Sequence, residues 1–142
     1  MKTTLLFLSV FLSVSLFAQN VYIPDANFKA YLVGNTAINT NGDTEIQLSE
    51  ASAFNGEINC VDMNISDLTG IEAFTALSSL QCNYNQLTSL DVSQNTDLDT
   101  LRCFYNQLTS LDVSQNTALT KFNCSYNQLT SLDVSQNTSL TR

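Results

Sequence analysis

Residues 84–96 read YNQLTSLDVSQNT, and the same letters recur without change at residues 105–117 and 126–138. Each copy begins 21 residues after the one before it (84, 105, 126), so the chain contains an internal repeat of fixed period. Such a period is typical of solenoid proteins, in which one unit is too small to bury its own apolar side and is stable only against its neighbours. The sequence therefore predicts one domain built by stacking similar units.

The apolar positions of one unit divide it into a strand and a return segment. In residues 101–104, which read LRCF, the core candidates Leu101 and Cys103 alternate with outward positions, and this is the period of a β-strand. Beyond them, Leu108 and Leu111 lie three apart, which fits neither a strand nor a full helix. Stacked units would form a parallel sheet, with strands about 4.8 Å apart, over one continuous core.

The unit pattern LxxLxCxxNxL resembles the leucine-rich-repeat signature LxxLxLxxNxL, with a cysteine in the third apolar position. It matches at residues 77–87, 98–108 and 119–129, where Phe122 replaces one leucine. A degenerate unit, one residue longer, is expected at about residues 55–76, so the repeats would occupy residues 55–142 with a period of 21–22 residues. The resemblance implies an α/β-type repeat solenoid: a parallel sheet, an irregular or 3-10 convex side and a short helical N-terminal cap.

In the leucine-rich-repeat family the asparagine of each unit has a structural role. The resemblance implies a buried side-chain ladder that satisfies backbone groups where each strand turns, because an amide supplies both a donor and an acceptor. The residues concerned are Asn85, Asn106 and Asn127.

Residues 1–19 are expected to be a secretory signal peptide. Met1 and Lys2 precede an apolar run that ends at Ala18 and is shorter than the roughly 20 residues of a membrane-spanning helix. Cleavage would leave a secreted, extracellular or cell-surface protein without membrane insertion. Lys2 would be lost, so the mature net charge would be 4 − 13 = −9. This acidity argues against nucleic acid and anionic membranes as partners.

Residues 20–54 do not follow the period and are predicted to cap the N-terminal edge of the solenoid. Pro24 and Asp25 indicate a helix start, and Gly34 with Asn35 indicates its end. A cap is needed because an open apolar edge would aggregate. The predicted apolar cover consists of Tyr22, Ile23, Phe28, Tyr31, Leu32 and Phe54.

Within the cap, residues 39–50 read NTNGDTEIQLSE, which resembles the EF-hand calcium loop D-x-[DN]-x-[DN]-G-x5-E. Two letters depart from that pattern, because Asn39 replaces the leading Asp and Thr44 replaces the turn Gly. The two interpretations are a polar loop with no cofactor, and a weak calcium site with a dissociation constant of about 10⁻⁴–10⁻³ M. The calcium ligands would be Asn39, Asn41, Asp43, Glu45 and Glu50.

Four cysteines follow the period and should align on neighbouring turns. An extracellular setting permits disulfides, whereas the inward position that they share with leucine favours buried free thiols. The chain has no histidine and no CxxC spacing, so zinc is not expected. The cysteines are Cys60, Cys82, Cys103 and Cys124.

The repeated units differ from one another mainly in their strand segments, which line the concave, ligand-binding face in the leucine-rich-repeat family. Arginine and aromatic residues there are typical of binding hot spots, although drift of exposed positions after duplication would also vary them. Three tyrosines at the strand ends should stack into a column. Asn83 is expected to point outward as well. The candidate ligand-binding residues are Gln81, Tyr84, Arg102, Phe104, Tyr105, Lys121, Asn123 and Tyr126.

The functional hypothesis is a secreted binding or adhesion module that recognises an extracellular protein, in preference to a glycan, on its concave face. The alternative is a structural spacer or targeting segment of a larger secreted protein, whose catalytic or anchoring domain would follow Arg142. The last residues open a new unit without a polar cap, so a truncated sequence is expected. An enzyme is not expected, because the repeats offer neither histidine nor a deep pocket. As a whole the chain resembles secreted leucine-rich-repeat proteins of the Bacteroidetes (flavobacterial) type.

Overall fold

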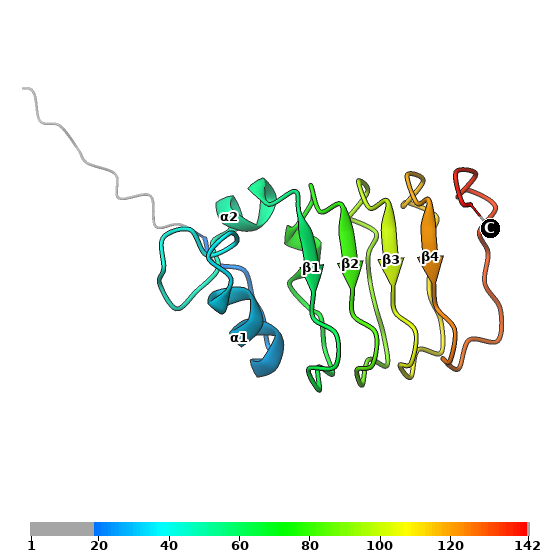
Figure 1. The fold of residues 1–142 in the computed structure, drawn as a ribbon, viewed down its shortest axis with the longest axis horizontal. Coiled ribbons are helices and arrows are strands. Elements are labelled where there is room, and N and C mark those ends of the chain that lie inside the picture. Colours follow the sequence, from blue (N-terminus) through cyan, green and yellow to red (C-terminus); the bar gives the residue numbers. More distant parts are fainter. Residues whose placement is uncertain (1–18, 142) are drawn as a thin grey trace, which may run out of the picture.

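The computed structural model describes residues 19–141 (Figure 1). The predicted signal peptide therefore lies almost entirely outside the described residues. Within residues 19–141, no helix combines the length and the apolar composition that a membrane crossing requires.

Four short parallel strands form one sheet in the order in which they occur in the sequence (Figure 1). Ile58 lies beside Leu80, Leu80 beside Leu101, and Leu101 beside Phe122. These residues are 22, 21 and 21 positions apart (58, 80, 101, 122), so the period of the sequence is the register of the sheet. The predicted parallel solenoid is confirmed. The strands are β1 (Glu57–Asn59), β2 (Ser79–Gln81), β3 (Thr100–Arg102) and β4 (Lys121–Asn123).

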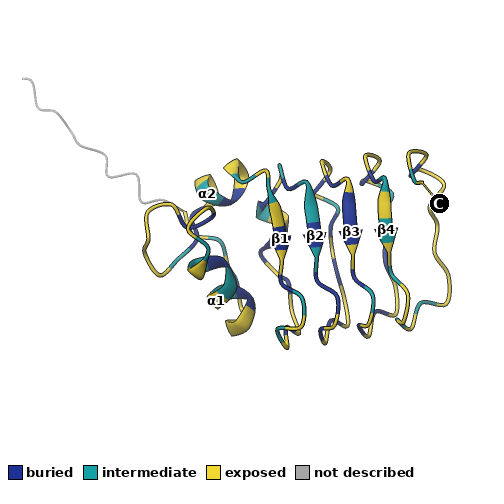
Figure 2. Cartoon of the chain, viewed as in Figure 1, coloured by how far each residue is buried: buried dark blue, intermediate teal, exposed yellow. Residues whose placement is uncertain are grey.

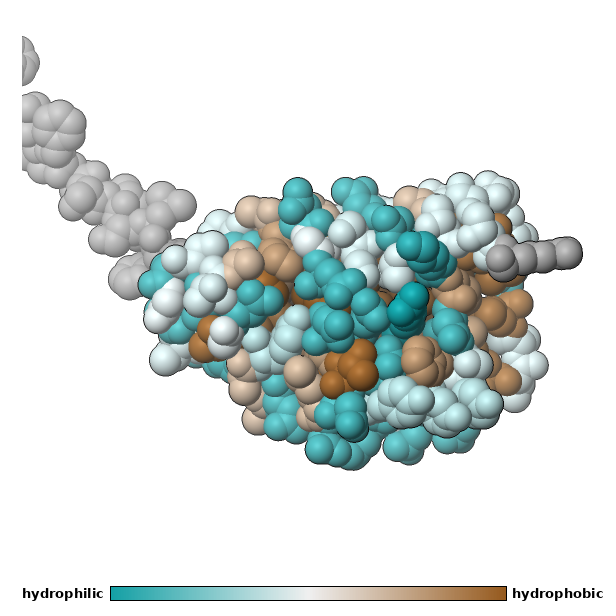
Figure 3. All heavy atoms as spheres, in the orientation of Figure 1, coloured by the Kyte–Doolittle hydropathy of each residue, from teal (hydrophilic) through white to brown (hydrophobic). Residues whose placement is uncertain are grey.

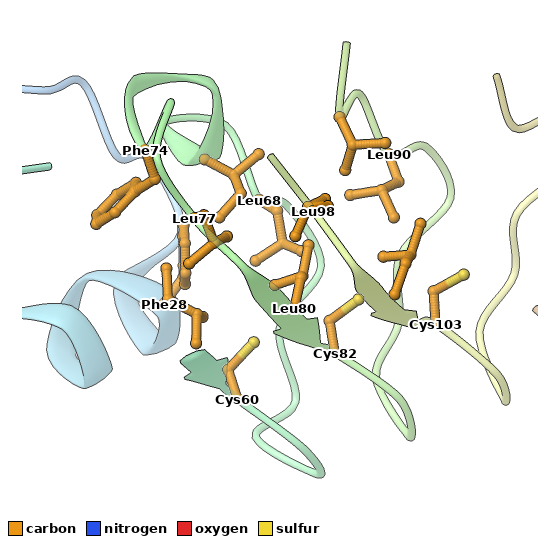
Figure 4. Packing of buried hydrophobic residues seen from close by; sticks show 14 of the residues in the cluster. Phe28, Cys60, Leu68, Phe74, Leu77, Leu80, Cys82, Leu90, Leu98 and Cys103 are labelled. Carbon is orange, nitrogen blue, oxygen red and sulfur yellow. The ribbon is translucent and has the colours of Figure 1, made fainter. Parts of the chain in front are cut away.

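The hydrophobic core runs through the repeat units between the strands and the return segments (Figures 2 and 4). Leu80 on β2 is fully buried. Burial decreases beyond β4, where Leu132 and Val134 are 38% and 39% exposed, while Leu111 and Val113 one unit earlier are 9% and 0% exposed. Each unit is thus covered by the unit that follows it, as stacking of incomplete cores requires.

The return segments on the side opposite the strands are irregular, as predicted. The first unit contains a short 3-10 helix, η1 (Ile71–Ala73), and the later units turn without regular helix.

A second asparagine ladder, not predicted from the sequence, crosses these return segments. The Nδ2 atom of Asn95 donates to the carbonyl oxygens of Ile71 and Phe74 at 2.8 and 2.9 Å. Asn116 and Asn137 repeat this arrangement, each with the unit before it. All three side chains are buried, and their Oδ1 atoms have no hydrogen-bond partner among the described residues. The ladder joins neighbouring units on the side away from the sheet.

The predicted helix at the start of the cap is present, and its first turn is fixed by Asp25. One carboxylate oxygen of Asp25 accepts the backbone N–H groups of Asn27 and Phe28 at 2.9 and 3.0 Å, which is an N-cap. The other oxygen accepts from the backbone N–H and the hydroxyl of Ser66 in the first unit. Asp25 thereby joins the cap to the solenoid. The cap helices are α1 (Ala26–Gly34) and α2 (Leu48–Ala53).

The cap covers the core at the β1 end of the sheet (Figure 1). Phe28 and Leu32 on α1 are fully buried, and the hydroxyl of Tyr31 accepts the backbone N–H of Asn59 on β1 at 2.8 Å. The prediction that Tyr22 belongs to this apolar cover is wrong, because its side chain is 76% exposed.

Candidate binding face

The outward side of β1–β4, together with the residues at the strand ends, is called the strand face here. It is the surface that the sequence predicts to be concave and to bind a ligand. Figure 3 shows the molecule in the orientation of Figure 1. Hydrophilic side chains cover most of the side facing the reader, with small hydrophobic patches between them.

The first asparagine ladder fixes the backbone at the strand ends. The Nδ2 atom of Asn106 donates to the carbonyl oxygens of Cys82 and Cys103 at 3.0 and 3.1 Å, and its Oδ1 atom accepts the backbone N–H of Leu87 at 3.0 Å. Each amide therefore satisfies backbone groups of two units at once. Asn85 and Asn127 make the equivalent bonds in their own units.

The tyrosine that precedes each ladder asparagine lies in the left-handed region of backbone space. The φ angles are 58° at Tyr84, 54° at Tyr105 and 53° at Tyr126. This conformation costs a residue with a side chain about 1–2 kcal/mol. The equivalent position of the first unit is Asp62, at φ 57°, and Asp adopts this region more readily than Tyr. Three successive units thus place a bulky ring where a small polar residue fits with less strain.

The three tyrosine rings stack in the predicted column. The ring centroids are 4.7 Å apart between Tyr84 and Tyr105, and 4.1 Å apart between Tyr105 and Tyr126, with interplanar angles of 13° and 3°. Phe104 meets Tyr84 and Tyr105 edge-on, with centroids 5.3 and 5.9 Å away. The interaction of Tyr105 with the Tyr126 hydroxyl raises the pKa of Tyr105 above its usual value. The column and Phe104 are called the aromatic cluster below.

Two exposed cations lie next to the aromatic cluster. Arg102 belongs to β3 and Lys121 to β4. The Nη1 atom of Arg102 donates to Oε1 of Gln81 at 3.4 Å, and Nε2 of Gln81 donates to a carboxylate oxygen of Glu57 at 2.8 Å. The only ion pair found in residues 19–141 lies in the cap. Arg102 and Lys121 therefore have no carboxylate of the described residues within 4.0 Å.

A hollow of about 490 Å³ gathers several of the predicted ligand-binding residues. Arg102, Phe104, Lys121 and Asn123 line it together with Thr120, Phe122 and Thr141. The Oδ1 atom of Asn123 accepts from the backbone N–H and the hydroxyl of Ser125, so this side chain is already held in place. Gln81 does not line the hollow, but its side chain accepts a hydrogen bond from Arg102, which does. Tyr84 and Tyr105 contact the lining residue Phe104 edge-on.

One predicted outward residue is not on the surface. Asn83 is only 5% exposed, so the prediction that it contributes to the strand face is wrong. The backbone carbonyl of Asn83 accepts the backbone N–H of Asp62, and Phe104 occupies the equivalent place in the next unit.

A larger hollow of about 600 Å³ lies among the return segments and does not touch the strand face. Its lining includes Ser89, Asp91, Ser110 and Asp112, which recur at the same places in successive units. Hydrogen bonds from Ser93 and Ser114 lower the pKa of Asp91 and Asp112, respectively, below the usual value. These carboxylates form turns with their own serines, and the hollow follows from the repeat itself.

In the EF-hand-like loop, the predicted ligand atoms hold the loop together. Asn39 is buried and its Nδ2 atom donates to the carbonyl oxygens of Val33 and Asp43. One carboxylate oxygen of Asp43 accepts from the Asn41 and Gln47 side chains, and the other accepts the backbone N–H of Glu45. The Glu45 side chain forms the ion pair with Lys29 at 2.7 Å.

Glu50 closes the same loop. One of its carboxylate oxygens accepts from the backbone N–H and hydroxyl of Thr40 and from the backbone N–H of Asn41, and the other accepts from Gln47. Although partial burial acts to raise it, these hydrogen bonds hold the pKa of Glu50 below its usual value. Among the described residues, no group of three or more His, Cys, Asp or Glu side chains is arranged to hold a metal ion. Calcium binding stays a prediction.

The four cysteines are free, one per unit, as favoured by the sequence, and Figure 4 shows Cys60, Cys82 and Cys103 aligned along the core. Burial raises the pKa of Cys60 and of Cys103 to about 12, and it also raises the pKa of Cys82 and Cys124. A thiol with such a pKa is almost wholly protonated at neutral pH and is a poor nucleophile. These cysteines act as small core residues.

Residues 39–142 match the family model described as the endo-beta-N-acetylglucosaminidase EndoS LRR domain. Among curated proteins, Internalin J of Listeria monocytogenes is 43% identical over 78 residues, which is 54% of this chain and 8% of that protein. The chain thus spans a small part of this relative.

Two solved structures share the fold. The functional domain of InlJ from Listeria monocytogenes, described as including a cysteine ladder, matches with a TM-score of 0.75 and 39% identity over 87% of this chain and 28% of that one. The internalin InlF of the same species matches with a TM-score of 0.69 over 89% of this chain and 38% of that one; at 20% identity it shows the fold alone. The resemblance to Bacteroidetes proteins stays a prediction.

Proposed function

Because the chain belongs to the EndoS leucine-rich-repeat domain family, we propose that it is a secreted binding and adhesion module that recognises an extracellular protein through its strand face. The homology to an internalin of Listeria is consistent with display outside the cell. The aromatic cluster is the observation that carries the proposal. Its tyrosine side chains are 49%, 41% and 68% exposed, in a backbone conformation that a tyrosine adopts only at a cost.

The composition of the strand face supports protein recognition. Tyrosine, phenylalanine and arginine are enriched in protein interfaces, and hot spots form where aromatic anchors cluster. Phe104 and Arg102 contribute to one hollow, next to the tyrosine column. The asparagine ladder holds these residues on rigid backbone, so little conformational entropy would be lost on binding.

The experiment compares the parent with an Arg102→Ala, Phe104→Ala double variant. Beads coated with each protein are scored for adhesion to cultured epithelial cells and to immobilised collagen, fibronectin and laminin. A Thr88→Ala, Thr109→Ala double variant, altered at exposed positions outside the strands, is the matched control. We expect the strand-face variant to lose at least about tenfold in adhesion, since a hot-spot truncation costs about 2 kcal/mol, and the control to behave as the parent.

Circular dichroism and thermal unfolding establish that all three proteins are folded. If the folded double variant adheres as well as the parent, the strand face is not the binding surface. If the parent adheres to nothing tested, the alternative proposal of a structural spacer or targeting segment gains support. The relatives, of which this chain covers 8% to 38%, show that such units occur within much longer proteins.

A further inference from the structure

The charges on the strand face are distributed unevenly along the solenoid. At the β1 end, the Glu57 carboxylate accepts hydrogen bonds from Ser79 at 3.0 Å and from Gln81 at 2.8 Å. At the β3–β4 end, Arg102 and Lys121 are exposed cations. The nearby Asp99 carboxylate is bonded to the hydroxyl of Thr100 at 2.6 Å. Glu57 and Asp99 thus have hydrogen-bond donors within the protein, while the two cations have no acidic partner in the described residues.

This arrangement contrasts with the chain as a whole, which carries 13 acidic and 5 basic residues. Two uncompensated cations in one hollow with Phe104 form a local site for negative charge beside an apolar surface. Complementary charges of this kind select partners more than they add affinity.

We propose that the ligand of the strand face is an acidic polypeptide segment, whose carboxylates pair with Arg102 and Lys121 and whose apolar side chains pack on Phe104 and the edge of the tyrosine column. This inference rests on the proposed function and specifies its partner. The two cations come from adjacent strands: Lys121 lies opposite Thr100, and Arg102 lies opposite Asn123, two positions further along. Phe104 lies two positions beyond Arg102, so a segment that runs from Lys121 past Arg102 would present its acidic side chains first and an apolar one after them.

The geometry of the aromatic cluster favours a polypeptide over an anionic sugar. A sugar stacks its C–H bonds on the electron-rich face of an aromatic ring. Both faces of Tyr105 are covered, because its neighbours lie at interplanar angles of 13° and 3° with centroids 4.7 and 4.1 Å away. The middle of the column, next to Phe104, therefore presents ring edges and hydroxyl groups, and these suit peptide groups and aliphatic or aromatic side chains.

The test measures fluorescence anisotropy of three labelled probes titrated with the protein. The probes are a peptide that alternates glutamate with phenylalanine and serine, the same peptide with every glutamate replaced by glutamine, and a polysialic acid oligomer. Each probe is titrated with the parent, with an Arg102→Gln, Lys121→Gln variant, with a Phe104→Ala variant, and with a Gln94→Glu, Gln115→Glu variant. The last variant changes the net charge by the same −2 at exposed positions of the return segments.

We expect the glutamate peptide to bind the parent more tightly than the glutamine peptide does. Its affinity should fall about fivefold in the Arg102→Gln, Lys121→Gln variant, in line with two exposed ion pairs, and should change little in the charge-matched control. If both peptides bind equally and Phe104→Ala abolishes this binding, the ligand need not be acidic, but the strand face is still the binding surface. If polysialic acid binds and the glutamate peptide does not, the ligand is an anionic sugar and the proposal of a polypeptide is wrong. Failure of all probes would overturn the inference, while the adhesion assay tests the proposed function separately.

Discussion

At the scale of single residues, each tyrosine of the column is exposed to solvent and also has a strained, left-handed backbone conformation. The left-handed backbone costs each tyrosine about 1–2 kcal/mol, and a stacked pair returns about 0.5–1.5 kcal/mol. These amounts are similar, so stability gives no strong reason to prefer tyrosine to the Asp62 of the first unit. The ladder asparagines differ from the tyrosines, because their amides satisfy buried backbone groups that have no access to water.

This contrast predicts two different effects on stability. Asn106→Ala removes bonds to the carbonyl oxygens of Cys82 and Cys103 and to the N–H of Leu87. We expect it to lower the free energy of unfolding by about 2–4 kcal/mol, because buried polar groups lose their partners. Tyr105→Asn should change it by less than about 1 kcal/mol, since relief of strain offsets lost stacking. Urea unfolding followed by circular dichroism measures both. The opposite order would show that the tyrosines and not the amides hold the turn.

At the scale of elements, the cap shows that carboxylates suited to bind a cation can instead hold a loop together by accepting hydrogen bonds. The predicted calcium ligands Asp43 and Glu50 are good oxygen donors for a cation, but in this structure their oxygens accept hydrogen bonds within residues 39–50. A calcium ion would have to displace those bonds. The loop is also attached to α2, whose capping box is formed by Gln47 and Glu50.

We therefore expect Glu50→Ala to lower the melting temperature by several degrees in the presence of EDTA, because about 1–2 kcal/mol of capping and loop hydrogen bonding is lost. The exposed Asp97→Ala is the control. Thermal unfolding with and without 5 mM calcium separates the two roles. If the parent is stabilised by calcium and the variant differs from it only when calcium is present, Glu50 is a metal ligand and the structural role is incorrect.

At the scale of the whole molecule, stability comes from contacts between neighbouring units. Each unit buries its leucines against the next, and the two asparagine ladders join units on both sides of the core. In such a stack, stability is approximately a sum of unit and interface contributions. An added unit should extend the stack without disturbing its neighbours.

Duplication of residues 98–118 in tandem should therefore yield a folded and more stable protein. Insertion of 21 residues into an ordinary globular core would disrupt it, but here the insert supplies one strand, one Cys103 and both ladder asparagines in register. We expect a higher urea midpoint and a larger m value, because more surface is exposed on unfolding. A less stable chain, or an unchanged m value, would contradict the stacking account.

The fold could be predicted largely from the sequence. The units repeat, so each position meets its own copy on the neighbouring strand, and the period of Leu80, Leu101 and Phe122 gives the register directly. The start of α1 was also predictable, since Asp25 is a strong local capping residue. The second ladder was missed, although its signal was present: an asparagine recurs at residues 95, 116 and 137, three positions after a valine and three before a leucine.

The candidate site was predictable only as a set of residues. Alternation placed Arg102, Phe104 and Lys121 on one face, but it also placed Asn83 there, and only the structure shows that this side chain is buried. Periodicity alone determined the solenoid, because copies of one unit can stack in register in a single way. Side-chain packing across the folded chain decided the rest: the burial of Asn83, the edge-on contacts of Phe104 with the tyrosine column and, among the described residues, the absence of an acidic partner for either cation. These depend on distances across the folded chain, and no local pattern encodes them.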